Sequence, residues 1–137
     1  MAGYSSTPLP KKLCIKEGAR VALVGAPDDF EATLGELPAG AKLVPPWRMG
    51  FDVVLLFARS RDELVGRFQT YAARIKSDGS LWVAWPKKSS GVKTDLTEDS
   101  IRLHGLDVGL VDVKVCAVDE AWSGLRFVYR LKDRPRR

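Results

Sequence analysis

Cysteine and histidine are scarce in this chain of 137 residues, which contains only Cys14, Cys116 and His104. Two cysteines are too few for a disulfide framework, and a lone histidine leaves a metal site or a hydrolase triad without its other members. No serine lies in a G-x-S-x-G elbow either. We therefore expect no metal, no cofactor and no catalytic residue, and we expect both thiols to be reduced, buried and inert.

Long apolar runs are also missing. The longest, Val53–Ala58 and Leu81–Trp85, have the length of a strand, whereas a membrane helix needs about 20 apolar residues. The first residues, MAGYSSTPLPKK, hold no apolar signal region. Hydrophobic residues make up 45% of the chain and charged residues 28%, which excludes a mainly disordered or fibrous protein. We expect one globular domain in the cytoplasm, with no membrane partner.

Basic residues exceed acidic ones by 22 to 17, but the excess is unevenly placed. The final segment KDRPRR carries four basic groups and one acidic group, so its own charge of +3 is more than half of the chain's net charge of +5. Short basic tails are usually solvated, so we do not expect nucleic-acid binding. Deletion of residues 133–137 is expected to leave the melting temperature nearly unchanged, because a charged terminal segment buries little surface.

Apolar periodicity predicts strands at four places before the C-terminal region. Continuous apolar runs at Arg20–Gly25, Phe51–Ala58 and Ser80–Trp85 are typical of buried strands. Lys42–Val44 is shorter and is followed by two prolines, which favours the edge of a sheet. An Asp-Gly turn at 78–79 is expected to precede the third buried run.

Helix signals separate these strands. A short helix is expected at Pro10–Ile15, and Asp28 or Asp29 is a suitable N-cap for the next helix. Ser60 and Glu63 have the spacing of a capping box, and the apolar stripe behind them runs to Ile75. Asp95 or Thr97 is expected to start the last helix. Val111–Val118 and Leu125–Leu131 then alternate as a closing hairpin.

This order of elements predicts an α/β fold: a Rossmann-like three-layer sandwich whose mostly parallel sheet ends in a C-terminal antiparallel hairpin. The domain is expected to span residues 13–131, with an extended arm at 1–12 and a basic tail at 132–137. Trp82 and Trp85 are three apart in one strand, so they should face opposite sides of the sheet.

Ligands of such sheets bind where the parallel strands end at their carboxyl termini. That edge should collect Gly25–Phe30, Ala58–Arg61, Trp85–Thr94 and Asp119–Ser123. A helix N-terminus at Gly25–Phe30 is able to hold an anion, but Asp28 and Asp29 cap that end and repel phosphate. We favour a structural turn there.

The loop after the strand Ser80–Trp85 is the strongest candidate for a ligand site. It offers lysine charges, two hydroxyls and a flexible glycine, which together suit an anionic group; the alternative is a solvated loop. Its candidate residues are Trp85, Lys87, Lys88, Ser89, Ser90 and Lys93.

The turn of the closing hairpin offers two adjacent carboxylates, Asp119 and Glu120, followed by Trp122. The acids are suited to act as acid and base or to pair with Lys87 or Lys88, and either tryptophan of this edge is able to shield the site. The alternative is a polar turn with Trp122 folded over it.

Two resemblances extend this interpretation. The strand Arg20–Gly25, the connection IKSDGSLWVAW and the closing hairpin resemble the Rossmann-like fold of S-adenosylmethionine-dependent methyltransferases. Those enzymes follow the first strand with a D-x-G-x-G loop, whereas Val24–Asp28 reads VGAPD. Their second strand ends in an acid, whereas this one ends in VPPW. We therefore expect no binding of S-adenosylmethionine.

The second resemblance is to a bacterial family of short proteins, domain of unknown function 3052. It is carried above all by WPKKSSG at Trp85–Gly91 and CAVDEAWSG at Cys116–Gly124, and it covers nearly the whole chain. The family implies no established activity.

These observations lead to a non-catalytic binding or regulatory module that holds an anionic small molecule or protein partner at the carboxyl edge of the sheet. The alternative is a degenerate methyltransferase-like or nucleotide-binding enzyme. A third hypothesis is a structural interaction protein that uses an exposed Trp47 and the N-terminal arm.

Overall fold

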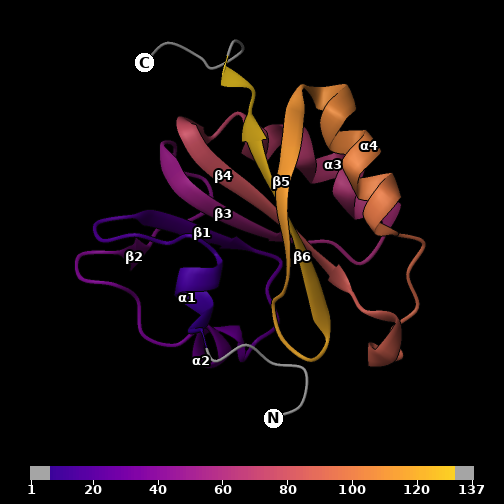
Figure 1. The fold of residues 1–137 in the computed structure, drawn as a ribbon, viewed down its shortest axis with the longest axis horizontal. Helices are drawn as coiled ribbons and strands as arrows, with labels where there is room; N and C mark the ends of the chain where they lie inside the picture. The colour runs from indigo at the N-terminus through magenta and orange to yellow at the C-terminus, as the bar shows by residue number, and fades with distance from the viewer. Residues whose placement is uncertain (1–6, 132–137) are drawn as a thin grey trace.

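The computed structural model describes residues 7–131, which form a six-stranded sheet with helices on both faces (Figure 1). Segments 1–6 and 132–137, and with them most of the expected arm and the basic tail, lie outside the described residues. The strands are β1 (Arg20–Val24), β2 (Lys42–Leu43), β3 (Phe51–Phe57), β4 (Ile75–Pro86), β5 (Leu110–Ala117) and β6 (Trp122–Tyr129).

The helices divide into two pairs, one on each face of the sheet (Figure 1). Short helices α1 (Leu9–Lys12) and α2 (Phe30–Leu34) cover one face, and the longer α3 (Arg61–Ala72) and α4 (Glu98–Val108) cover the other. A single turn of 3-10 helix, η1 (Lys88–Ser90), lies in the loop after β4.

The strands are arranged in the order β2-β1-β3-β4-β6-β5. The pairs β1–β2, β1–β3 and β3–β4 are parallel, whereas β4–β6 and β5–β6 are antiparallel. The predicted α/β, Rossmann-like fold with a C-terminal antiparallel hairpin is therefore confirmed, and the short β2 lies at the edge as its prolines indicated.

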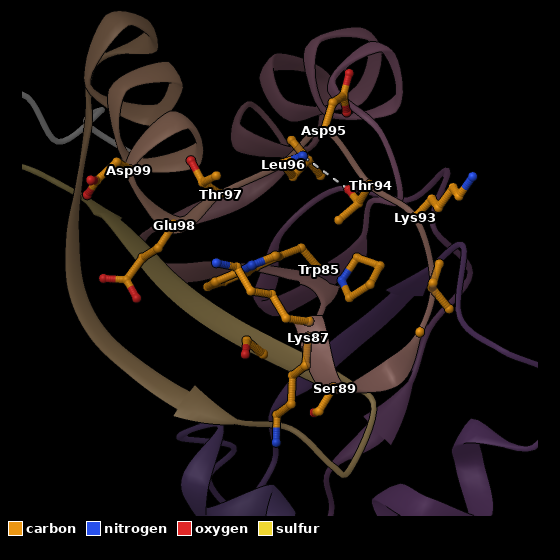
Figure 2. Close-up of a pocket in the computed structure, with 15 residues that line it drawn as sticks. Trp85, Lys87, Ser89, Lys93, Thr94, Asp95, Leu96, Thr97, Glu98 and Asp99 are labelled. Atoms are coloured by element: carbon orange, nitrogen blue, oxygen red, sulfur yellow. Dashed lines mark hydrogen bonds between the residues drawn. The ribbon is translucent and has the colours of Figure 1, made fainter.

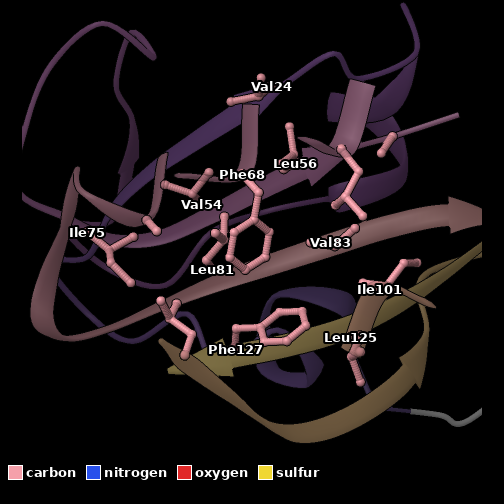
Figure 3. Packing of buried hydrophobic residues seen from close by; sticks show 14 of the residues in the cluster. Val24, Val54, Leu56, Phe68, Ile75, Leu81, Val83, Ile101, Leu125 and Phe127 are labelled. Carbon is pink, nitrogen blue, oxygen red and sulfur yellow. The ribbon is translucent and has the colours of Figure 1, made fainter. Parts of the chain in front are cut away.

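Two apolar layers flank the central strands. On the α3–α4 face, Phe68 packs edge-to-face on Phe127 with ring centroids 5.1 Å apart (Figure 3). On the α1–α2 face, the indole of Trp82 is fully buried and donates a hydrogen bond to the Leu13 carbonyl at 3.0 Å. Trp85 belongs to the α3–α4 layer, so the two tryptophans of β4 face opposite sides as predicted.

Strand β4 is longer than predicted. It begins at Ile75, which the periodicity had placed on the preceding helix, and it passes through Asp78 and Gly79, where a turn was expected. The pairing with β3 shifts register here, from Phe51↔Ile75 to Val53↔Ser80. The extra residues form a bulge, in which a Cβ on Gly79 would lie only 2.8 Å from the Phe51 carbonyl oxygen.

The short elements also differ from the expectation. Helix α1 ends at Lys12 and lies inside the segment expected to be extended, since Pro8 and Pro10 suit the first turn of a helix. Helix α2 ends at Leu34, and its N-cap residue Asp29 makes no side-chain capping bond. Strand β6 starts at Trp122, three residues before the predicted position, which shortens the hairpin turn.

Both longer helices begin at the predicted caps. Ser60 Oγ accepts a hydrogen bond from the Glu63 amide at 3.2 Å, while the Glu63 carboxylate accepts from the Arg59 amide instead of that of Ser60. At α4 the cap is Thr97, one of the two expected starts, and its partner in the capping box is Ser100.

The two cysteines are half-buried free thiols, so the expectation of full burial was wrong. Burial still raises the pKa of Cys116, which keeps its sulfur protonated at neutral pH. None of the helices within residues 7–131 has the length and apolar character needed to cross a membrane. In the same range no three His, Cys, Asp or Glu side chains gather as a metal-binding group.

Candidate functional site

A cleft of about 1080 Å³ opens between the carboxyl end of β4 and the start of α4 (Figure 2). Its position at this edge agrees with the site predicted for the loop after β4. The lining comes from three segments: the end of β4 with the following loop, the approach to α4 with its first turn, and Ser123 of β6.

The loop after β4 is held in place by its own backbone. The Lys87 amide donates to the Ala121 carbonyl at 2.8 Å, which ties the loop to the β5–β6 turn. Helix η1 follows, and Gly91 ends it with a positive φ of 77°, a conformation that other residues adopt only with strain. The loop that carries the lysines therefore has a defined backbone conformation.

Ser90 has a structural role in this loop. Its hydroxyl donates to the Lys87 carbonyl at 2.6 Å and accepts from the Val92 amide at 3.1 Å, which closes the turn. Ser89 lines the cleft, whereas Ser90 does not. One of the two predicted hydroxyls is thus available to a ligand.

The opposite wall is the first turn of α4, which the sequence had not assigned to the site. The Ser100 amide is capped by Thr97 Oγ1 at 3.1 Å. The amides of Glu98 and Asp99 come earlier in the turn and have no hydrogen-bond partner within residues 7–131. They give this wall a positive backbone potential.

The carboxylates on this wall are already engaged. Arg102 donates to Glu98 Oε2 at 2.6 Å and to Asp99 Oδ1 at 2.8 Å, and it also binds Asp112 of β5 at 2.8 Å. The bonds to Asp112 and Glu98 raise the pKa of Arg102 further above its ordinary value. Asp95 accepts the Arg61 amide at 2.8 Å, so it caps the start of α3.

The lysines of the cleft differ from its carboxylates. The side chains of Lys87, Lys88 and Lys93 line the cleft, and none of them makes a hydrogen bond or ion pair within the described chain. Figure 2 shows Lys87 beside Trp85 at the centre of the cleft and Lys93 on its far side. Within residues 7–131 the cleft therefore combines three lysines without a partner with three acids that each have one.

Trp85 forms the apolar floor. It is only 8% exposed and packs with the core layer of α3 and α4, next to the buried Leu96. An apolar floor lowers the local dielectric and strengthens each charge contact above it. Trp85 lies where a shielding tryptophan was expected, and the shielding itself stays a prediction.

The predicted residues of the hairpin turn lie outside the cleft. Asp119 Oδ1 accepts the amides of Ala121 and Trp122 at 2.8 and 2.9 Å, so its carboxylate shapes the turn. Glu120 is exposed and does not line the cleft. Within residues 7–131 neither acid pairs with Lys87 or Lys88, so that interpretation is corrected.

Trp122 faces the other side of the sheet. In the pairing of β4 with β6, Trp85 lies opposite Ser123, and Pro86 lies opposite Trp122. Since paired residues point to the same face and successive residues to opposite faces, Trp85 and Trp122 point to opposite faces of the sheet. The Trp122 ring packs edge-to-face on Phe57 at 4.9 Å, and Phe57 packs on Phe30 at 4.8 Å. It therefore shields the α1–α2 layer instead of the cleft.

An arginine that the sequence had not singled out connects the ends of β1 and β3. Arg59 donates from Nη2 to the Gly25 carbonyl at 3.2 Å, and its guanidinium lies 5.1 Å from the centre of the Trp122 ring. Arg59 comes directly after a buried strand, within the expected edge segment 58–61, and this position could have identified it from the sequence. The Gly25 carbonyl at the start of the turn Gly25–Phe30 is thus engaged by protein, and the structural role favoured for this turn stays a prediction.

Sequence comparison identifies no relative: no family model matches the chain, and no curated protein matches it. The resemblance to domain of unknown function 3052 therefore stays a prediction.

Solved structures with the same fold are numerous. A TehB-like SAM-dependent methyltransferase from Corynebacterium glutamicum aligns with a TM-score of 0.59 and 10% identity, over 94% of this chain and 91% of that one. A SAM-dependent methyltransferase from Aquifex aeolicus aligns with a TM-score of 0.59 and 14% identity, over 85% of each chain. A ribosomal protein L11 methylase from Lactobacillus delbrueckii subsp. bulgaricus gives a TM-score of 0.63 and 12% identity, over 89% and 75%. At such identities the likeness shows the architecture alone: the chain has the Rossmann-like α/β fold found in SAM-dependent methyltransferases.

Proposed function

We propose that this protein is a non-catalytic binding or regulatory module that holds an anionic ligand, or an anionic group of a partner, in the cleft between the β4 loop and α4. One observation carries the proposal. The three lysines of the cleft have no partner within the described chain, whereas each of its carboxylates accepts a hydrogen bond from an arginine side chain or amide.

The strength of such a site depends on its floor. A charge-assisted hydrogen bond contributes about 1.5–3 kcal/mol when it is partly desolvated and about 0–1 kcal/mol on an open surface. Lys87 is half-buried beside Trp85, while Lys88 and Lys93 are exposed. We therefore expect a ligand with several negative charges to bind with a dissociation constant on the order of 0.1 mM, and a single carboxylate to bind far more weakly.

The residues of the β1 turn do not fit S-adenosylmethionine, which argues against the methyltransferase alternative. Gly25 is the only glycine of the turn, and a Cβ at this position would lie 3.2 Å from the Phe57 carbonyl oxygen and 3.1 Å from the Arg67 guanidinium. Arg59 also donates a hydrogen bond to the Gly25 carbonyl. Pro27 removes one amide, and the end of β2 supplies no acid for ribose hydroxyls.

The test is a calorimetric titration of the protein with tripolyphosphate, which measures the affinity. The variant Lys87→Ala/Lys88→Ala is expected to bind at least about tenfold more weakly than the wild type, because two of the three free charges are gone. The control Lys11→Ala/Lys16→Ala removes two exposed lysines elsewhere and should bind like the wild type. Equal affinity of all three proteins would reduce the cleft to a solvated loop, provided that circular dichroism shows the same fold.

A further inference from the structure

The loop between β2 and β3 exposes apolar side chains that the proposed cleft does not use. Trp47 is 72% exposed and Met49 is 55% exposed, whereas the other three tryptophans are at most 8% exposed. An indole ring in water leaves a large apolar area unburied. Trp, Met and Arg are also the residue types enriched at protein interfaces, and here they are consecutive, at Trp47–Met49.

Two arginines from neighbouring segments donate hydrogen bonds to the carbonyls of this loop. Arg74 Nη1 donates to the Pro46 carbonyl at 2.7 Å. Arg20 donates from Nε to the Gly50 carbonyl and from Nη2 to the Met49 carbonyl, both at 3.2 Å. Because the loop is already ordered, a partner that binds it loses little conformational entropy.

A small cationic cleft of about 330 Å³ lies next to the loop. Lys42 and Arg48 line it, and their side chains make no hydrogen bond or ion pair within residues 7–131. The other lining residues are Arg20, Leu43, Val44 and Pro45, so no carboxylate contributes to it. The charge of this surface is complementary to an acidic partner.

The backbone of β2 adds a third feature. The amides of Lys42 and Val44 donate to the β1 side, to Ala19 O at 3.0 Å and Val21 O at 2.7 Å. Since neighbouring residues of a strand point their backbone groups in opposite directions, the N–H and C=O of Leu43 face away from the sheet. They form a short open edge that another extended chain can complete.

We propose that an extended acidic segment of a partner protein docks on β2 and the Trp47 loop. Its backbone pairs with Leu43, its carboxylates bind Lys42 and Arg48, and an apolar side chain packs on Trp47. A peptide fits better than a nucleic acid because the open edge offers backbone groups that a peptide backbone complements. The surface is formed by β2, at the far edge of the sheet from β5, and it is independent of the cleft at β4.

The experiment measures fluorescence anisotropy of a labelled peptide of alternating glutamate and valine. The wild type is expected to bind it saturably. Trp47→Ala and the double variant Lys42→Glu/Arg48→Glu should each weaken binding by about tenfold or more. The control Lys11→Glu/Lys16→Glu makes the same change in net charge at exposed positions outside both clefts and should retain the wild-type affinity.

Three results would overturn the proposal. One is the absence of saturable binding to the wild type. Another is an equal loss of affinity in the charge-matched control, which would mean nonspecific attraction. The third is tighter binding of a labelled oligothymidylate than of the peptide, which would identify a nucleic-acid surface. All altered side chains are exposed or half-exposed, so the variants should fold, and circular dichroism verifies this.

Discussion

Gly105 shows how a single residue decides the packing of α4 on the sheet. A Cβ at this position would lie 2.1 Å from Cε1 of Phe127, which is itself fully buried. Glycine inside a helix costs about 1 kcal/mol relative to alanine, so the position keeps glycine because the ring needs the space.

The variant Gly105→Ala should therefore destabilise the protein by about 1–3 kcal/mol, because the ring or the helix must move. Gly66→Ala in α3 is the matched control, since a Cβ there meets nothing within 4 Å, and it should stabilise by about 0.5–1 kcal/mol. Urea unfolding measures both changes. Equal shifts in the two variants would contradict the packing argument.

His104 gives the fold a dependence on pH. Its Nε2 is buried and has no hydrogen-bond partner among residues 7–131, and its ring packs edge-to-face on Phe68 at 5.3 Å. Burial, and to a smaller extent the nearby charge of Arg61, lower its pKa in the folded state, while Asp107 acts in the opposite direction. The unfolded chain therefore takes up a proton at a higher pH than the folded one does.

It follows that His104 contributes stability above a pH of about 6.5 that is lost as the pH falls through its folded-state pKa. Urea unfolding of the wild type at a series of pH values from neutral to mildly acidic should show this loss. The variant His104→Leu should have a flatter profile over the same range. Parallel profiles for the two proteins would mean that the imidazole is not responsible.

At the scale of the elements, the cap of α4 positions one wall of the cleft. Thr97 and Ser100 exchange hydrogen bonds of 3.0 and 3.1 Å, which fix where the helix begins. Thr97→Ala should cost about 1 kcal/mol in the free energy of unfolding. Thr70→Ala, at an exposed position inside α3, should change it by less than about 0.5 kcal/mol in thermal unfolding. A neutral Thr97→Ala would show that the cap does not hold the helix.

The elements also show what local sequence can reveal. Apolar runs and caps predicted every strand and both long helices, because burial and capping leave periodic signals. The start of β4 was missed because Ile75 continues the helical spacing of Tyr71 and Ala72, although the chain turns back at Arg74, whose amide donates to the Tyr71 carbonyl. Only pairing with Phe51 of β3 decides that Ile75 is in a strand.

The same limit applies to the candidate site. The lysines of the β4 loop were predictable from their place after a buried strand. The contribution of Glu98 and Asp99 to the wall of the cleft was not predictable, because it depends on where the start of α4 lies against the sheet. The prediction that Trp122 lies at the cleft was wrong because the register of β6 against β4 decides which face of the sheet its side chain is on. A shift of one residue in that register moves the side chain to the opposite face.

At the scale of the whole molecule, the sheet has the Rossmann-like α/β fold found in SAM-dependent methyltransferases, and two places along its carboxyl edge differ in character. After β1, the side chains of Phe30, Phe57, Trp122 and Arg59 pack against one another in series. The cleft lies at the end of β4, where lysines without a partner in residues 7–131 meet the start of α4. We propose as the central claim that an anionic ligand binds at the end of β4 and that no cofactor binds after β1.

An NMR titration of backbone amides, with S-adenosylhomocysteine and tripolyphosphate added separately, tests this claim most directly. Tripolyphosphate is predicted to shift the amides of residues 87–99 and the indole of Trp85, and S-adenosylhomocysteine is predicted to shift none. Saturable shifts at Gly25–Phe30 and Trp122 on adding S-adenosylhomocysteine, with no response of residues 87–99 to tripolyphosphate, would contradict the account and favour a cofactor-binding enzyme.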